Sequence, residues 1–443
     1  MPPSITKTES IHEASSASFI RSQLPEKPPI GDTSLQVENR IYDAQELAKF
    51  HPGGELFVKA FAGRDATLVF LSYHRKKFPH NRVSFALETV DPTVRDQDVR
   101  EVDEDYLELC RRVHKVIPSH KTFATWHYYA KVFTLMIIAL SLEGYMHYYG
   151  EYTSLLAISI GLCYASIGLN IQHDGNHGAI SRRPWINRLG GLSMNYIGHS
   201  SVDWVHQHVV QHHIYTNDVD LDPDIDGTFI YRLNPIKPLL QFHALQYIYY
   251  FLIINMYGVT LSFYTLENLV KGVHFTSLST LAQKYWKWES LGPLLLILRL
   301  YVLPLIRVPS IWTLLNMALL MGVFGHYVAF FFILSHNFVG VHHSKGETKI
   351  KSFAYKQAAC SSNVGGRLLA FFNGGLNYQI EHHLFPRMCH IHYPTVAPIV
   401  RAFCEEKSIP YHHFPTITEN FVSTAEHLLS LGTEENPESL KFL

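Results

Sequence analysis

Residues 153–177 have the sequence TSLLAISIGLCYASIGLNIQHDGNH, an apolar run that ends in two histidines four residues apart. Residues 153–171 come close to the roughly 20 residues that an α-helix needs to cross a bilayer. A comparable apolar run precedes them at residues 128–148, and Gly150 and Glu151 between the two runs indicate a tight turn. This part of the chain therefore predicts a helical hairpin in a membrane, with a histidine cluster at its end.

Two more histidine clusters follow much later in the chain. The second is HVVQHH at residues 208–213, and the third is QIEHH at residues 379–383. Histidines four residues apart project from one face of a helix, and neutral imidazole is the commonest protein metal ligand. Three such clusters separated by apolar stretches predict a metal centre at a membrane surface, with room for more than one ion. The candidate ligands are His173, His177, His208, His212, His213, His382 and His383.

Composition excludes some functions and sets the expected compartment. The formal net charge of the 443 residues is −1, so a nucleic-acid partner is not expected. Five scattered cysteines without a C-x-x-C pair indicate free thiols in a reducing compartment. Residues 1–32 are rich in Ser, Pro, Glu and Lys and have no apolar core, so we expect a disordered segment and not a secretory signal.

Changes in polarity divide the rest of the chain. We expect a small soluble domain at residues 33–102, a charged linker at 103–125, a membrane domain at 126–415 and a C-terminal tail at 416–443. The expected fold class is mainly α, with a multi-pass membrane domain of about four transmembrane helices.

Which apolar stretches cross the membrane after the first hairpin stays open. The candidates are residues 247–263, 291–306 and 311–335. An even number must cross if all three histidine clusters are to share one side. Residues 307–310 resemble a short turn, which favours a second hairpin of 291–306 and 311–335 with 247–263 in the membrane interface. In the alternative, 247–263 crosses and 291–306 does not.

The soluble domain contains HPGG at residues 51–54 and a second histidine, His74, with GRDAT at residues 63–67 between them. This pattern resembles the cytochrome b5 family, a small α+β fold in which two histidines bind one haem b. The resemblance implies that His51 and His74 are the axial ligands. Pro and two Gly after His51 permit the tight turn that this role needs. Two nitrogen ligands leave the iron no open position, so the expected role is electron transfer.

With such a domain in front and the clusters HxxxH, HxxxHH and QxxHH behind, the chain resembles the front-end fatty-acyl desaturases over nearly all residues after 33. Residues 172–178, 213–217 and 376–386 sharpen the likeness, and Gln379 replaces the first histidine of the third cluster, as is typical of that family. Within the family, the sequence looks closest to algal and protist enzymes of the Δ5 type.

The resemblance implies an enzyme with two iron ions and O2 as co-substrate. It would insert a cis double bond between the carboxyl end and an existing double bond of a polyunsaturated acyl-CoA or acyl-lipid, with Δ5 favoured and Δ6, Δ4 and Δ8 possible. Electrons would come from NADH through a separate cytochrome b5 reductase and the fused haem domain. The expected location is the endoplasmic reticulum membrane, with the haem domain and active site facing the cytosol.

Further metal ligands are expected near the clusters, together with acids that accept a hydrogen bond from the ligand rings. Related desaturases have a histidine at the cytosolic end of the last span, and His336 lies at that place, so we expect an eighth ligand there; the alternative is a helix-end histidine favoured by the helix dipole. Gln379 is expected to bind a metal weakly or to orient a water. Metal-bound histidines usually donate their second N–H to a carboxylate or carbonyl. Acids placed for this role are Asp174, Asp203, Asp218 and Glu381.

Three rival functions stay open: a sphingolipid long-chain-base desaturase, a lipid hydroxylase, and a non-enzymatic membrane haem carrier with structural zinc. Residues 222–227 begin like a calcium loop, but Leu233 occupies the position of the required glutamate, so we expect only an acidic loop. The remaining histidines near the clusters are expected to be bystanders. They are His80, His206, His342, His343, His390, His392, His412 and His413.

Overall fold

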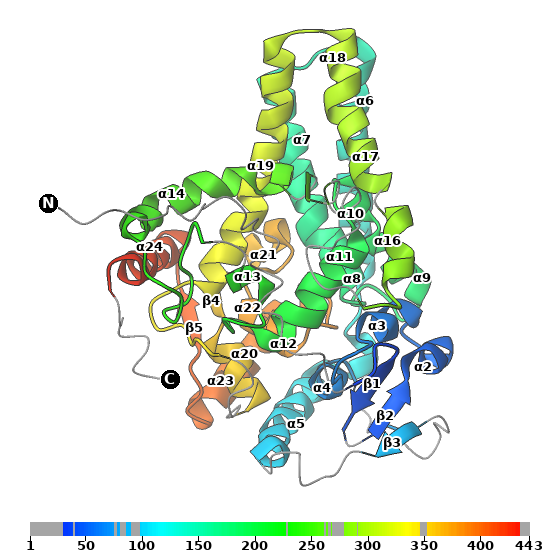
Figure 1. Cartoon of the computed structure of the whole chain (residues 1–443), viewed down its shortest axis with the longest axis vertical. Coiled ribbons are helices and arrows are strands. Elements are labelled where there is room, and N and C mark those ends of the chain that lie inside the picture. The colour runs from blue at the N-terminus through cyan, green and yellow to red at the C-terminus, as the bar shows by residue number, and fades with distance from the viewer. Residues whose placement is uncertain are drawn as a thin grey trace, which may run out of the picture.

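The computed structural model describes most of the chain. The described residues are 30–38, 40–74, 78–79, 86–89, 98–226, 229–260, 263–264, 267, 279–289, 291–345 and 352–434. The expected disordered segment lies outside this range except for residues 30–32, and so does His80. In Figure 1 the described residues form a helical bundle at one end, a mixed body in the middle and a small N-terminal domain beside that body.

The N-terminal domain is a small sheet with three short helices. Strands β1 (Ser34–Val37), β2 (Arg40–Asp43) and β3 (Ala86–Thr89) form an antiparallel sheet in the order β1-β2-β3. Asp43 ends β2 and caps the next helix, because its carboxylate accepts from the backbone N–H groups of Gln45 and Glu46. The helices are α2 (Ala44–Phe50), α3 (Glu55–Ala60) and α4 (Thr67–Tyr73). The expected α+β fold of this domain is therefore present.

The bundle consists of two antiparallel hairpins (Figure 1). The first contains α6 (Trp126–Tyr149) and α7 (Ser154–Ile167), and α7 continues through a π-helical turn, η2 (Gly168–Gln172), into α8 (His173–Asn176). The second pairs α19 (Ile311–His336) with a chain of shorter segments. These are α17 (Leu291–Ile297), the π-helical η6 (Leu298–Val302) and α18 (Leu303–Arg307).

Among the described residues, three helices are long and apolar enough to cross a membrane: Ser119–Tyr149, Ser154–Asn176 and Ile311–His336. The fourth leg of the bundle, α17 to α18, is held by a buried ion pair: Arg299 on η6 donates to the Glu143 carboxylate on α6, with Nε 2.7 Å from Oε1. Close backbone approach also tightens the bundle, because a Cβ on Gly161 of α7 would lie 2.6 Å from the Leu320 carbonyl oxygen of α19.

The described part of the stretch at 247–263 is not one long helix. It contributes α14 (Gln246–Ile253) and the 3-10 turn η5 (Ile254–Met256). In Figure 1 α14 runs across the base of the bundle and not along it. The two hairpins, 128–171 and 291–335, supply the legs of the bundle, and the membrane crossing of 291–306 stays a prediction.

Short elements between and after the hairpins build the central body. They are η1 (Ser119–Lys121), α9 (Pro184–Gly191), α10 (Ser193–Tyr196), α11 (Ser201–Trp204), η3 (Val205–His212), α12 (His213–Tyr215), α13 (Pro223–Asp226), η4 (Gln241–Leu245), α16 (Gln283–Glu289), α20 (Phe353–Ala359), β4 (Ser362–Val364), α21 (Arg367–Asn373), α22 (Gln379–Leu384), η7 (His390–His392), α23 (Tyr393–Glu406), β5 (His412–Phe414) and α24 (Ile417–Thr433). Strands β4 and β5 pair in parallel.

Two segments differ from the expected domain plan. Most of the expected linker at 103–125 belongs to a long helix, α5 (Asp98–Val116), whose Tyr106 is fully buried and donates to the Leu384 carbonyl oxygen at 2.6 Å. The expected C-terminal tail contains α24, which packs on α14 and η4. Both helices bury one face in the body, so they are part of the fold and not connectors.

The N-terminal domain is docked onto the body. Lys59 on α3 donates to the Tyr285 hydroxyl on α16 at 3.0 Å, and the same hydroxyl donates to Glu55. Leu56 packs with Val202 and Ala282 in a small apolar cluster next to these contacts. This docking places α3 against η3, which carries part of the second histidine cluster, and Tyr73 of α4 against His177 of the first.

Candidate metal centre and haem pocket

The three histidine clusters meet in one buried centre at the base of the bundle. His173 and His177 come from α8, His208 from η3, and His382 and His383 from α22. None of the seven candidate histidines is more than 4% exposed. Chain segments more than 150 residues apart thus converge, since His213 Nε2 lies 3.0 Å from His382 Nε2.

The second cluster lies on a π-helix, which differs from the regular helix expected from the spacing. The backbone N–H of His213 donates to the carbonyl of His208, five residues earlier, as in a π-helical turn. This wider turn brings His213 back over His208, so that their Nε2 atoms lie 3.1 Å apart. The π-helix is therefore the reason why both histidines point into the same centre.

The ring nitrogens form two groups that could each hold a metal ion. His173, His177, His208 and His382 have ligand atoms within 4.8 Å of one another, and so do His212, His336 and His383. His213 joins them, because it forms a further such group with His382 and His383. The arrangement has space for two neighbouring ions.

Unpaired buried nitrogens support a cation in this centre. His173 has no hydrogen-bond partner on either ring nitrogen, and Nε2 of both His177 and His212 also has none. A buried polar group without a partner costs free energy, about 1–3 kcal/mol each. Two nitrogens that bind one ion at about 2.1 Å lie about 3 Å apart at a right angle, which is the spacing of His213 and His382.

Most second ring nitrogens are held by partners outside the centre. The Nδ1 atom of His383 lies 2.8 Å from the Gln357 amide oxygen. That of His212 lies 3.1 Å from the Asp222 carboxylate, and that of His382 lies 3.2 Å from the Tyr393 hydroxyl. The corresponding partner of His336 is the Cys360 carbonyl oxygen at 2.8 Å, and that of His177 is the Tyr73 hydroxyl at 2.8 Å. These contacts fix each ring with Nε2 toward the centre, as in known metal sites.

Burial keeps the rings in the form that binds metals. It lowers the pKa of His177, His208, His213, His382 and His383, and neighbouring rings lower the pKa of each further. His212 differs: burial alone would lower its pKa, but the Asp222 and Asp224 carboxylates raise it to about 9. Since both acids lie on its Nδ1 side, they also favour a cation at Nε2.

The structure places His336 and Gln379 beside the second group. His336 ends α19 and is 5% exposed. The amide nitrogen of Gln379 lies 2.9 Å from His336 Nε2 and 3.3 Å from His383 Nε2, and Gln379 Oε1 has no hydrogen-bond partner. Both side chains therefore face the same space as His383 and His212.

Two of the acids that the sequence favoured contact groups other than the candidate ligand rings. Asp174 contacts His390 Nδ1 at 2.8 Å, and Glu381 accepts from Asn363 and Tyr411 at 2.8 and 2.9 Å. Asp222, on the expected acidic loop, instead contacts His212. Gln357, Tyr393 and Tyr73 were also missed, because nothing in their local sequence connects them with a histidine cluster.

The haem pocket lies between α2, α3 and α4 and opens toward the metal centre. His51 and His74 face each other with ring centroids 5.8 Å apart. The pocket has a cavity volume of about 150 Å³, and it is lined mostly by apolar side chains, as expected for an organic cofactor. One wall comes from the body and includes His177, Arg182 and Arg387.

Both candidate haem ligands have a fixed orientation. His51 Nδ1 lies 2.8 Å from the Gly54 carbonyl oxygen, and His74 Nδ1 lies 3.1 Å from the Phe70 carbonyl oxygen. With Nδ1 placed to donate to these carbonyls, the lone pair of each neutral ring is on Nε2, the nitrogen that would bind iron. Burial lowers the pKa of His51 and so favours its neutral form, which is the form that binds iron. The residues present fit a haem.

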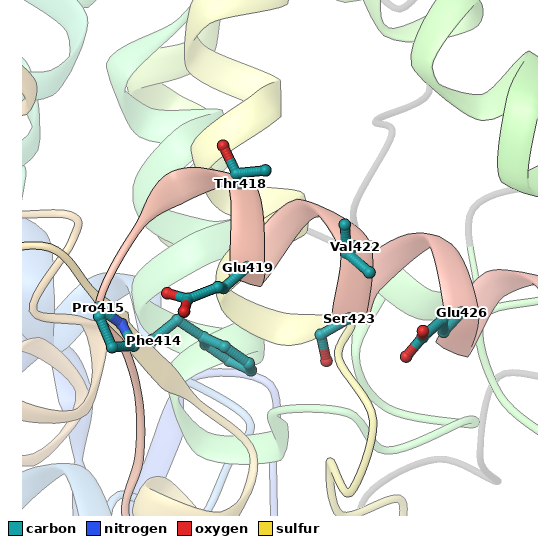
Figure 2. A pocket seen from close by; sticks show the side chains of 7 residues that line it. All are labelled: Phe414, Pro415, Thr418, Glu419, Val422, Ser423 and Glu426. Carbon is teal, nitrogen blue, oxygen red and sulfur yellow. The ribbon is translucent and has the colours of Figure 1, made fainter.

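A separate surface pocket lies at the start of α24 (Figure 2). It is lined by Phe414, Pro415, Thr418, Glu419, Val422, Ser423 and Glu426. Glu419 is already used in a capping box with Thr416, which fixes the first turn of the helix. This pocket carries no histidine and does not include any residue of the metal centre.

Fold and site together define a membrane oxidoreductase class in which a haem domain is docked on a histidine-lined metal centre. The sequence profile of the fatty acid desaturases matches residues 152–415, and that of the cytochrome b5-like haem/steroid-binding domain matches residues 25–120. The chain belongs to the fatty acid desaturase family and is an enzyme, an oxidoreductase.

Several relatives align over nearly the full length. An acyl-lipid (7-3)-desaturase of Rebecca salina is 40% identical, with 98% of each chain covered. An acyl-lipid (7-3)-desaturase of Diacronema lutheri is 38% identical, with 99% of each chain covered. The Delta(5) fatty acid desaturase A of Dictyostelium discoideum is 30% identical, with 93% of each chain covered. The resemblance to desaturases with a fused cytochrome b5 domain is thereby confirmed.

Proposed function

We propose that the chain is a front-end acyl-lipid desaturase, which inserts a cis double bond between the carboxyl end and an existing double bond of a polyunsaturated acyl chain. The observation that supports it best is the convergence of imidazoles from all three clusters and from His336 on one buried centre next to a haem pocket. Relatives named acyl-lipid desaturases along the whole chain support the same conclusion.

The proposed centre holds two iron ions. His173, His177, His208 and His382 bind the first, and His212, His336 and His383 bind the second. His213 lies between the two groups, and Gln379 lies beside the second. When bound, the irons supply the chemistry with O2 that removes two hydrogen atoms from neighbouring methylene groups.

The chain's own residues orient the ligands and keep water out. Trp204 packs on His208 with ring centroids 4.4 Å apart and also contacts His173 and His177, each at 5.5 Å. Phe332 contacts His208 from α19 at 5.6 Å. These apolar rings give an acyl chain a dry surface at the reacting centre. Asp222, Gln357 and Tyr393 hold the ligand rings from behind.

Electrons enter through the N-terminal domain in this proposal. His51 and His74 hold a haem b, and the reductant is NADH, used by a separate cytochrome b5 reductase. We place the haem domain and the active site on the cytosolic face of the endoplasmic reticulum membrane. The N-terminal domain lies at the end of the molecule away from the turns of the bundle (Figure 1), and its Tyr73 contacts His177 at 2.8 Å, which supports a shared side.

Two positions are candidates for the new double bond. The Δ5 position, which the sequence favoured, has support from the Dictyostelium Delta(5) enzyme at 30% identity. The (7-3) position has support from the relatives at 40% and 38% identity, which match over almost their full length. Because the two (7-3)-desaturases are more similar to this chain than the Delta(5) enzyme is, we propose the (7-3) specificity as the first candidate and Δ5 as the second.

Expression in a yeast that lacks polyunsaturated fatty acids tests the function. Cells are fed separate C18, C20 and C22 polyunsaturated acids, and the fatty-acid profile locates any new bond in lipids and in acyl-CoA. A new cis bond on the carboxyl side of the existing bonds is expected. Hydroxylated acids would support a hydroxylase, altered long-chain bases a sphingolipid desaturase, and neither product a haem carrier.

Two matched histidine variants make the same test specific for the centre. His336→Ala removes a proposed ligand, and we expect the new product to disappear. His342→Ala changes a histidine outside the centre, whose ring packs on Tyr355 at 5.9 Å, and product should persist. Full product formation with His336→Ala would remove this residue from the ligand set.

A further inference from the structure

Tyr73 joins the haem pocket to the metal centre. It ends α4 directly before His74, and its ring lines the haem pocket. Its hydroxyl oxygen lies 2.8 Å from Nδ1 of His177. One residue is therefore linked to a haem ligand by the backbone and to a metal-centre histidine by a hydrogen bond.

The far side of this contact leads directly into the centre. His177 Nε2 has no hydrogen-bond partner, and the His177 ring lies 4.6 Å from His213 and 4.8 Å from both His173 and His382. When Nε2 binds an ion, the proton of a neutral imidazole is on Nδ1, which then donates to the Tyr73 oxygen. The contact thus connects Tyr73 with a ring that belongs to the metal centre.

Neighbouring side chains hold Tyr73 in one position. Phe57 packs on the Tyr73 ring from α3, with centroids 6.3 Å apart, and Arg387 approaches the Tyr73 carbonyl oxygen at 3.5 Å. The residue is held between the two domains and does not need to move.

We propose that Tyr73 is the coupling residue through which electrons pass from the haem to the metal centre, along the path His74, Tyr73, His177. The inference rests on the proposed function. In each transfer, one ferrous haem iron becomes ferric and one ferric iron of the centre becomes ferrous, while Tyr73 keeps its proton and its electrons. The competing path runs across the pocket from the haem edge to His177 and needs no hydroxyl.

Tyr73→Phe and Tyr393→Phe form a matched pair for the test. Each removes one hydroxyl next to Nδ1 of a centre histidine, His177 or His382, and keeps the aromatic ring. Tyr393 lies on α23 and is not part of the haem pocket. If the two hydroxyls only orient ligand rings, both substitutions should change electron transfer alike. If the Tyr73 hydroxyl couples the haem to the centre, Tyr73→Phe should slow the transfer more than Tyr393→Phe.

The experiment uses the purified full-length enzyme with haem and iron content measured first. Haem is reduced by a limiting amount of dithionite without O2 or substrate, and its reoxidation by the ferric centre is followed in the visible spectrum. We expect Tyr73→Phe to retain haem and to slow reoxidation, because the hydrogen bond between the phenol and His177 that completes the proposed path is lost. Reoxidation per bound iron should be faster in Tyr393→Phe than in Tyr73→Phe.

A bypass separates failure of this inference from failure of the proposed function. Reduced methyl viologen delivers electrons to the centre directly, and a single turnover is started with O2 and a polyunsaturated acyl substrate. Product from the unchanged enzyme tests the proposed function alone. Under the inference, Tyr73→Phe forms as much product per bound iron as Tyr393→Phe in this bypass, because both variants lack one ring-orienting hydroxyl and neither needs the haem.

Four results would overturn the role of Tyr73. They are unchanged haem reoxidation in Tyr73→Phe, equal slowing in both variants, loss of haem from Tyr73→Phe, and less product per bound iron from Tyr73→Phe than from Tyr393→Phe in the bypass. The first would favour the path across the pocket, and the second and fourth would give the hydroxyl an orienting role only. The third would make Tyr73 a haem-holding residue.

Discussion

Most ligand histidines of the metal centre are held by a partner on the side of the ring that faces away from the proposed ions. Most centre histidines have Nδ1 next to a carboxylate, amide, hydroxyl or backbone carbonyl, and the partners of His212, His382, His336 and His383 lie outside the clusters, 10 to 26 residues along the chain. Such partners set the tautomer and raise the basicity of the ligand nitrogen. The ring orientation is therefore a property of the folded body and not of the histidine clusters themselves.

Asp222 offers the sharpest test at this scale. Its carboxylate is fully buried and lies 3.1 Å from His212 Nδ1. We expect Asp222→Asn to weaken iron binding about 10–100-fold, because the amide can no longer supply the negative charge behind the ring. Iron titration of the metal-depleted protein measures the change.

Asp220→Asn is the matched control for that variant, because Asp220 lies in the same turn but is exposed. Equal iron affinity in the Asp222→Asn and unchanged proteins would show that the carboxylate does not support a metal ligand. An equal loss of iron affinity in both variants would point to the overall negative charge of this turn and not to the contact between Asp222 and His212.

Sequence patterns were sufficient for the histidines but not for their partners. The spacing of the clusters and the HPGG turn identified the rings that the structure brings together, since ligand spacing is a local property. Tyr73 lies 104 residues from its partner His177 and Gln357 lies 26 from His383, so only the tertiary fold connects them. Asp222 was read as part of a plain acidic loop for the same reason.

At the scale of elements, irregular helices position the ligands. Two of the three π-helical segments in the described residues, η2 and η3, lie directly before or within a histidine cluster, and π-turns are often found at functional sites. The sequence predicted regular helices here, because a spacing of four residues fits an α-helix. It gave no sign of the wider turn that brings His213 over His208.

Two helices outside the expected domain plan can be explained in similar terms. In α5, Tyr106, Leu109, Cys110 and Val113 are buried at helical spacing, a pattern that was readable but hidden among many charges. The buried face of α24 contains Asn420, Thr424 and His427, so its inward side looks polar in sequence. A hydropathy criterion alone could not assign that helix to the core.

Gly175 tests how tightly α8 must pack. A Cβ at this position would lie 2.4 Å from the Gly191 backbone nitrogen of α9 and 2.6 Å from the Gly190 carbonyl carbon. Gly175→Ala should therefore separate α8 from α9, lower stability by about 1–3 kcal/mol and displace His173 and His177. Thermal unfolding in detergent and iron content measure both effects.

Gly144→Ala is the control, because a Cβ on this glycine of α6 meets nothing within 4 Å. It should leave iron content unchanged and the unfolding temperature equal or higher, since Ala favours helix over Gly. If both variants behave alike, the close approach of α8 and α9 does not position the first cluster.

His427 makes the docking of α24 sensitive to acid. It is buried and stacked on His343, and burial lowers its pKa from 6.5 to about 4. As pH falls below 6.5, the unfolded chain gains a proton that the folded chain cannot accept, so stability decreases until about pH 4. The loss approaches about 3 kcal/mol for this group.

Replacing His427 by Phe should therefore make the unfolding temperature less dependent on pH between 6.5 and 4. His413→Gln is the control, because His413 is exposed in the middle of β5. An unchanged pH profile in His427→Phe would contradict the claim that this buried ring makes α24 acid-sensitive.

For the whole molecule, the two hairpins place both of their turns at the end of the bundle away from the metal centre. Arg307 donates to the Tyr148 carbonyl oxygen at 3.1 Å, which joins the two turns (Figure 1). Glu151 is exposed in the first turn, and Glu405 is exposed on α23 in the body. These two positions should therefore lie on opposite sides of the membrane.

Two separate variants, Glu151→Cys and Glu405→Cys, test this topology in sealed, cytosolic-side-out vesicles. A membrane-impermeant maleimide should label the Glu405→Cys protein at once and the Glu151→Cys protein only after the vesicles are opened. Four of the five native cysteines are buried and Cys163 is half-buried in α7, so their background should be low. Labelling of both positions in intact vesicles would contradict the two-hairpin arrangement.

The central claim is that histidines from three distant clusters bind two neighbouring irons. Iron analysis and iron X-ray absorption of the purified enzyme, with the haem contribution subtracted through a His51→Ala, His74→Ala protein, test it most directly. The account predicts two non-haem irons per chain in a mainly nitrogen environment. One iron or none, or a first shell dominated by carboxylate oxygen, would contradict it.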